Sequence, residues 1–126
     1  MKIVILVARL LLGLTFVFFG LNGLLHFLPQ PPMADGPAKQ FLTALATTPY
    51  MNFVAAIQII SGVLFLVDRF VPLALTLIAP VIVNILLFHS FMAPNTILPG
   101  ILVTIFWIIV FIRHRTAFVG IFRSQS

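Results

Sequence analysis

The chain has 126 residues, of which 62% are hydrophobic and only 7% are charged. A soluble domain is about 45–50% apolar and about 25% charged, so this composition excludes an ordinary soluble globule and predicts an integral membrane protein. The formal charge of +5 comes without a soluble basic face, which argues against nucleic acid as a partner, and the lack of cysteine excludes disulfides, thiol catalysis and cysteine-ligated iron–sulfur clusters in this chain.

Apolar segments of the length that crosses a lipid bilayer dominate the chain. A spanning helix needs about 20 mainly apolar residues, and four segments approach this length. They predict an all-α fold, a single domain over residues 1–126 that forms a four-helix transmembrane bundle. The expected parts are helices over 3–28, 50–67, 72–91 and 96–112, an outer loop over 29–49 and a basic tail over 113–126 that lies along anionic headgroups.

The first expected helix has two distinct sides. At 100° per residue, one side is a polar stripe of Thr15, Asn22 and His26, and the nearly opposite side is a stripe of Arg9, Gly13 and Gly20. Glycines at this spacing let two helix backbones approach closely. We therefore expect this helix to be central, with its glycines in helix packing.

The outer loop is the only long connection. It opens with P-Q-P-P, residues 29–32, which cannot continue a helix. Asp35 followed by Gly36 and Pro37 is typical of a helix start, with the aspartate as the capping residue. The spacing of the following apolar residues, Phe41, Leu42 and Leu45, predicts a short helix over 37–48 on the outer surface. It would serve either as a lid over the bundle or as a cover for helix ends.

The second expected helix carries Ala55, Gln58 and Gly62 on one face, and we assign Gly62 to helix packing. It ends in the tight turn V-D-R-F-V-P, residues 67–72. In this turn we expect Asp68 to form an ion pair with the adjacent Arg69.

The third and fourth helices contain further polar groups. Thr76, Pro80 and Asn84 follow one another at intervals of four, and Pro80 has no N–H to donate to the Thr76 carbonyl. We therefore expect the helix to kink at Pro80, and we assign Pro80 to helix packing. In the fourth helix, the indole N–H of Trp107 needs a hydrogen-bond acceptor.

The distribution of basic residues predicts the orientation. Basic residues collect on the cytoplasmic side of short loops. An N-terminus inside places six basic residues on the inner face and only Lys39 outside; the six are Lys2, Arg9, Arg69, Arg113, Arg115 and Arg123. Both termini are therefore expected in the cytoplasm.

Several polar and aromatic residues fall at similar heights in the outer half. They are Asn22, His26, Gln58, Asn84, Phe88 and His89. Intramembrane polar residues usually face the bundle interior, so these residues predict a ligand pocket. The candidate ligand is a quinone or another flat lipid, stacked among phenylalanines and bonded through its carbonyl.

Three other interpretations stay open. His26 and His89 at equal height would suit the two axial ligands of a haem, the weaker cofactor candidate. Alternatively, the bundle is a small-solute permease. Proton-coupled transport generally needs an acidic residue inside the membrane, and Asp35 and Asp68 both lie outside the core. Finally, the asparagines and glutamine would only bond helices together, and the histidines would only face headgroups or water.

Three stretches together resemble the DoxX-like family of small four-helix bacterial membrane proteins. They are A-R-L-L-L-G-L-T-F-V-F-F-G-L-N-G (8–23), G-V-L-F-L-V-D-R-F-V-P-L-A-L (62–75) and A-P-V-I-V-N-I-L-L-F-H-S-F (79–91). The resemblance carries to Gly13, Gly20, Arg69, Pro72, Asn84 and His89 as family-like positions without assigned chemistry.

The resemblance implies a role beside a redox enzyme. The family takes its name from the membrane subunit of a thiosulfate:quinone oxidoreductase, and other members resemble partners in oxidative-stress complexes. We therefore expect an accessory or anchoring subunit of such an oxidoreductase. An enzyme acting alone is not expected, because the chain has no cysteine and no acidic residue in the membrane core. A non-enzymatic packing protein that associates with itself is the alternative.

Overall fold

The computed structural model describes residues 1–28, 33–122 and 124, so the P-Q-P-P stretch and Arg123 lie outside the described residues. The described chain is helical throughout, apart from turns and short connections, which confirms the all-α prediction. Its helices are α1 (Lys2–Leu25), α2 (Pro37–Ala46), α3 (Tyr50–Val67), α4 (Val71–Phe91), the 3₁₀ helix η1 (Pro94–Thr96), α5 (Leu98–Arg113) and the 3₁₀ helix η2 (Arg115–Phe122).

Three of these helices, α1, α3 and α4, are long and apolar enough to cross a membrane. The fourth candidate, α5, has 16 residues and reaches that length only together with η2, which is bent by 84° from it. At ~1.5 Å per residue, α5 is about 24 Å long, against about 30 Å for a bilayer core. The described chain therefore has three to four candidate spans, and the predicted basic tail turns sharply away from α5.

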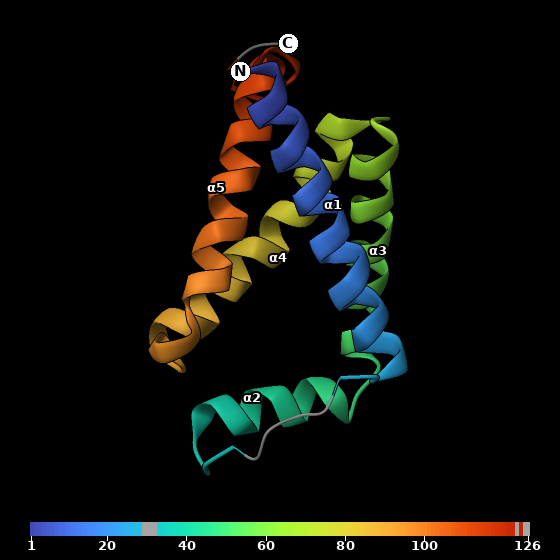
Figure 1. Cartoon of the computed structure of the whole chain (residues 1–126). Coiled ribbons are helices and arrows are strands. Elements are labelled where there is room, and N and C mark those ends of the chain that lie inside the picture. The colour runs from blue at the N-terminus through green and yellow to red at the C-terminus, as the bar shows by residue number, and fades with distance from the viewer. Residues whose placement is uncertain (29–32, 123, 125–126) are drawn as a thin grey trace.

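The helices form a wedge that is closed at one end (Figure 1). Both chain termini and the α3–α4 turn lie at this closed end, which we call the termini end. Toward the opposite end, α1 and α3 diverge from α5 and the second half of α4, and α2 lies across the opening. We call this the α2 end.

Glycines determine how closely α1 and α3 pack. A Cβ atom on Gly13 would lie 2.9 Å from the Gly62 carbonyl oxygen, and one on Gly62 would lie 2.8 Å from the Gly13 carbonyl oxygen. Further along, a Cβ on Gly20 would lie 3.0 Å from the Ala55 carbonyl oxygen. Real Cβ atoms essentially never come closer than 3.0 Å to another heavy atom, so the contact between Gly13 and Gly62 requires glycine at both positions. Gly13, Gly20 and Gly62 therefore lie at the contact between α1 and α3, where helix packing was expected.

The hydrophobic core occupies the termini end. Its buried members come from the first half of α1, the end of α3, the first half of α4 and α5; they are Ala8, Leu12, Phe16, Phe65, Val71, Ala74, Leu75, Ile78, Ile82, Val103 and Val110. Beside it, the indole N–H of Trp107 donates to the Leu75 carbonyl oxygen at 3.1 Å, which confirms that the indole finds an acceptor. The α2 end has no comparable set of buried apolar residues among those described.

The α3–α4 turn departs from the expected pairing. Asp68 and Phe70 both adopt left-handed backbone conformations in this turn. This geometry brings the Asp68 carboxylate to 3.7 Å from Nε of Arg9, and Nη1 of Arg9 donates to the Phe65 carbonyl oxygen. The prediction of a local ion pair with Arg69 was therefore wrong. Arg9 instead ties the middle of α1 to the end of α3.

Two helix ends also differ from expectation. The first helix ends at Leu25, three residues early, because His26 adopts a left-handed conformation and the Asn22 side chain accepts a hydrogen bond from the Leu28 N–H at 2.9 Å. At the start of α2, the N-cap is Gly36 with φ 152°, a conformation that favours glycine. Asp35 is not the cap; its carboxylate lies 3.1 Å from Nζ of Lys39.

Candidate ligand-binding site

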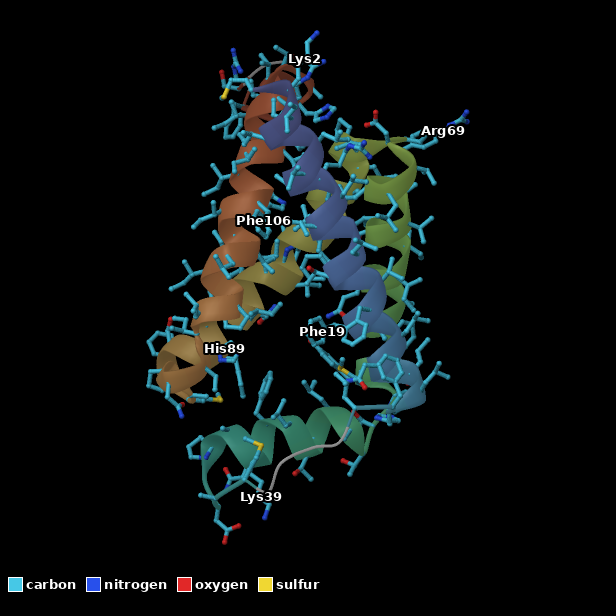
Figure 2. The ribbon with its side chains drawn as sticks, in the orientation of Figure 1. Lys2, Phe19, Lys39, Arg69, His89 and Phe106 are labelled. Atoms are coloured by element: carbon cyan, nitrogen blue, oxygen red, sulfur yellow. The ribbon has the colours of Figure 1, made fainter. Side chains whose placement is uncertain are left out.

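A cavity of about 1290 Å³ lies at the α2 end, where the helix pairs diverge. Its walls come from α1, α3 and α4, its far side from the residues around η1, and its floor from α2. Figure 2 shows Phe19 and His89 on facing helices, with α2 across the opening between them. This volume is large enough for a sizeable organic ligand, since small-molecule sites run to about 300–1,000 Å³.

Five of the six residues predicted to form a pocket line this cavity: Asn22, Gln58, Asn84, Phe88 and His89. They come from three different helices, α1, α3 and α4. These residues, predicted from helical rise to share the outer half of the bundle, therefore border one space.

His26 does not line the cavity. It follows the last residue of α1, its backbone is left-handed, and its side chain is exposed. The predicted polar stripe assumed that the helix continues past residue 26, whereas the left-handed backbone of His26 ends it. The haem interpretation needs two histidines that face one another, and the structure does not bring His26 to the cavity that His89 lines.

Gln58 is the most buried polar residue of the cavity wall. Its side chain is on α3, the residue is only 7% exposed, and Oε1 has no hydrogen-bond partner among the described residues. Ser61, one turn further, is fully buried, and its hydroxyl also lacks a described partner. A buried polar group without a partner costs about 1–3 kcal/mol.

His89 is held by the connection between α4 and α5. Its Nδ1 lies 2.8 Å from the Thr96 hydroxyl oxygen and 3.4 Å from the Ala93 carbonyl oxygen. The Thr96 hydroxyl itself donates to that same carbonyl at 3.0 Å. The ring is therefore oriented by η1, and Nε2 is the nitrogen left without a partner among the described residues.

The asparagines are already engaged in local hydrogen bonds. Nδ2 of Asn84 donates to the Pro80 carbonyl oxygen at 2.9 Å, one turn earlier in α4. α4 continues as a helix through Pro80, and the Thr76 hydroxyl donates to the Pro72 carbonyl oxygen, one turn before it. Asn22 uses its carbonyl oxygen for the Leu28 N–H. Each asparagine thus keeps only part of its hydrogen-bonding capacity for a ligand.

The floor of the cavity is the apolar side of α2. Phe41, Leu42 and Leu45 line the cavity, and the Phe41 ring centroid lies 5.4 Å from that of Phe88 on α4. None of the residues of α2 is buried, so this helix is held at one side only. The sequence predicted the apolar side of α2 but not that it faces Phe88.

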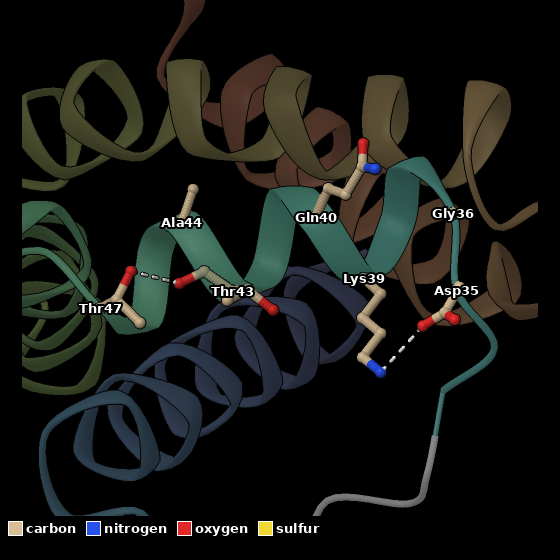
Figure 3. A pocket seen from close by; sticks show the side chains of 7 residues that line it. All are labelled: Asp35, Gly36, Lys39, Gln40, Thr43, Ala44 and Thr47. Carbon is tan, nitrogen blue, oxygen red and sulfur yellow. Dashed lines mark hydrogen bonds and ion pairs between the residues drawn. The ribbon is translucent and has the colours of Figure 1, made fainter.

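The polar side of α2 carries a shallow depression of about 490 Å³ (Figure 3). Here Lys39 pairs with Asp35, and the Thr47 hydroxyl donates to the Thr43 carbonyl oxygen at 2.8 Å. These groups bond within α2 and reach no other helix. The depression is therefore the polar surface of an amphipathic helix, whose apolar side closes the large cavity.

At the termini end, His114 follows α5. Burial lowers the pKa of this imidazole from its usual 6.5, the positive charge of Arg113 lowers it further, Asp68 acts in the opposite direction and Arg9 lowers it. This group lies at the other end of the molecule from the cavity and takes no part in it.

Comparisons with protein-family models, with curated proteins and with solved structures find no match for this chain. The resemblance to the DoxX-like family therefore stays a prediction from the sequence. The cavity, its polar lining residues and its amphipathic floor are the observations on which function can be argued.

Proposed function

We propose that this chain is a multi-pass protein of a bacterial inner membrane with both termini in the cytoplasm. The support is the distribution of charge along the wedge. Lys2 and Arg69 lie at the termini end and Lys39 lies at the α2 end (Figure 2). Arg113 and Arg115 follow at the end of α5, near the chain termini. Basic residues favour the cytoplasmic side, so the α2 end is the outer end.

In this orientation the cavity belongs to the outer half of the bundle and binds a lipid-like ligand with a flat polar ring. The single observation that carries this function is a cavity of about 1290 Å³ that combines phenylalanine rings, among them the Phe41–Phe88 pair, with the polar side chains of Asn84 and His89. Aromatic side chains bind flat rings, and a few convergent polar groups select the ligand. An isoprenoid quinone has this chemistry.

The molecular role that fits such a site is an accessory or anchoring subunit for a quinone-linked or oxidative-stress-related oxidoreductase. The likeness to the DoxX-like family supports this part of the proposal, and the cavity supports the quinone. In this role, electrons would reach the ligand from the oxidoreductase partner.

The test is gentle purification of the tagged protein from its own host, followed by mass spectrometry of bound lipids and proteins. We expect a quinone-type lipid and a stoichiometric oxidoreductase partner. The double variant Asn84→Leu/His89→Leu is expected to lose the lipid, whereas Ser90→Ala, on the same helix outside the cavity, keeps it. Recovery of the chain alone without any ring-bearing lipid would contradict the proposal.

A further inference from the structure

The termini end carries positive charge that the acidic side chains of the protein do not neutralise. The sequence has seven Lys and Arg residues but only two acidic residues, and both acids are already paired. The Asp35 carboxylate lies 3.1 Å from Nζ of Lys39, at the α2 end. The Asp68 carboxylate lies 3.7 Å from Nε of Arg9, at the termini end. The other basic side chains that the structure describes therefore have no acidic side chain left to pair with.

Three of these basic residues gather where the two ends of the chain meet. Lys2 begins α1, Arg113 ends α5 and Arg115 begins η2, and all three are exposed. The start of α1 lies beside the end of α5 (Figure 1). We call Lys2, Arg113 and Arg115 the basic patch.

The 3₁₀ helix η2 places apolar side chains next to the basic patch. Because η2 is bent by 84° from α5, it lies nearly parallel to the membrane surface when α5 crosses the membrane. Phe118 holds it in place, since its ring centroid lies 5.1 Å from that of Phe111 on α5. Val119, Ile121 and Phe122 stay exposed. Exposed apolar side chains next to basic ones are typical of a segment at the boundary between headgroups and acyl chains.

An anionic phospholipid matches both features. Its phosphate pairs with basic side chains, and its acyl chains cover apolar ones, whereas a soluble phosphate would match only the basic patch. We propose that the basic patch and η2 form a binding surface for the headgroups of anionic phospholipids, such as phosphatidylglycerol. This surface lies at the opposite end of the molecule from the cavity and does not depend on the ligand proposed there.

The single tryptophan of the chain can report on a lipid at this surface. Trp107 lies six residues before Arg113 on α5, which is about 9 Å along the helix. Its ring stacks on Phe111, the same ring that Phe118 of η2 contacts. The acyl chains of a lipid whose headgroup binds Arg113 therefore pass close to the indole. Bromine atoms midway along those chains would quench its fluorescence.

The test uses the full chain reconstituted in phosphatidylcholine nanodiscs that contain increasing fractions of a brominated lipid. Brominated phosphatidylglycerol and brominated phosphatidylcholine are compared at neutral pH and low salt. The two quenching curves give the affinity of one lipid relative to the other. We expect phosphatidylglycerol to bind about fivefold more tightly or better, because one basic residue at an anionic surface contributes about this factor.

Variants separate the charge of the patch from its other properties. Arg113→Gln/Arg115→Gln should bring the two lipids close to equal affinity. Arg113→Lys/Arg115→Lys retains the charge and should retain the preference, which distinguishes loss of charge from misfolding. Lys2→Gln should lower the preference, whereas Lys39→Gln, the same exchange at the α2 end, is the matched control and should leave it unchanged.

Equal quenching by the two lipids in the unchanged protein would overturn the proposal. An equal loss of preference in the glutamine and lysine double variants would also overturn it, because the charge would then not be the cause. Inorganic phosphate should leave the preference intact. If phosphate abolished it and sodium chloride of equal ionic strength did not, the patch would bind a soluble phosphate and not a headgroup. None of these results bears on the cavity, whose test is the recovery of a ring-bearing lipid.

Discussion

At the scale of single residues, the useful question about a polar side chain is which of its atoms are already paired. Asn84 and His89 are both polar residues of α4, yet Asn84 donates within its own helix whereas His89 is oriented by Thr96 seven residues later. What each can offer a ligand follows from the bond that it has already made. From residue type alone, both side chains would be given the same role, that of bonding the carbonyl of a bound ligand.

Gly62→Ala should destabilise the protein. The added Cβ would lie 2.7 Å from Val17 Cγ2 and 2.8 Å from the Gly13 carbonyl oxygen, so α1 and α3 must move apart. Overpacking of this kind costs about 1–3 kcal/mol. Unfolding in mixed micelles with increasing sodium dodecyl sulfate measures it. Gly120→Ala is the control, since a Cβ there meets nothing within 4 Å; equal effects of the two exchanges would contradict the packing role.

The stability of the termini end should depend on pH through His114. Burial and Arg113 lower the pKa of this histidine in the folded protein, so the unfolded chain binds the proton more readily. The free energy of unfolding should therefore be full above the unfolded pKa of 6.5 and decrease as the pH falls below it. Melting temperatures measured between about pH 8 and about pH 5 test this. His114→Gln should have a shallower pH dependence; an unchanged profile would assign the effect to other groups.

At the scale of elements, α2 is the only α-helix among the described residues that has no buried residue. It is amphipathic, none of its residues is buried, and an aromatic contact between Phe41 and Phe88 joins it to α4. An element with few buried contacts opens locally at low free energy. This makes α2 the natural route by which a ligand enters the cavity.

Phe41→Ser should loosen α2 without unfolding the bundle. The exchange removes the ring that contacts Phe88, so the amide protons of residues 37–46 should exchange faster while those of α1 and α3 keep their protection. Hydrogen exchange followed by mass spectrometry measures both in one experiment. Gln40→Ser, on the polar side of α2, is the control; the same acceleration in the control would show that the Phe41–Phe88 contact does not hold the helix.

At the scale of the whole molecule, the two ends of the wedge have different tasks. The termini end holds the apolar core, the Arg9–Asp68 pair and most of the basic residues. The α2 end holds the cavity, where helix pairs have diverged. A bundle packed tightly along its full length would have no space for a ligand, so the divergence of α4 and α5 from α1 and α3 creates the site.

The orientation can be measured directly because the chain has no cysteine. Lys39→Cys, on the polar side of α2, should react with a membrane-impermeant maleimide in intact spheroplasts. Thr116→Cys, in η2, should react only after the membrane is opened. Labelling of Thr116→Cys alone in intact spheroplasts would reverse the proposed orientation, and labelling of both would place part of the chain outside the expected topology.

The all-helical fold, the places of the long apolar helices, the close-packing glycines and five residues of the cavity wall could be predicted from the sequence alone. These properties depend on hydropathy and on helical periodicity, which act over neighbouring residues, so Gly13, Gly62, Asn84 and His89 could be assigned without coordinates. His26 was misplaced because one left-handed residue ended the helical path early.

Which atoms meet across the helices depends on the tertiary structure. The pairing of Arg9 with Asp68, the contact of Phe41 with Phe88 and the divergence that opens the cavity depend on how helices cross, and crossing is set by contacts between residues far apart in the chain. For the same reason, the free carbonyl of Gln58 and the orientation of His89 by Thr96 have no signature in the local sequence.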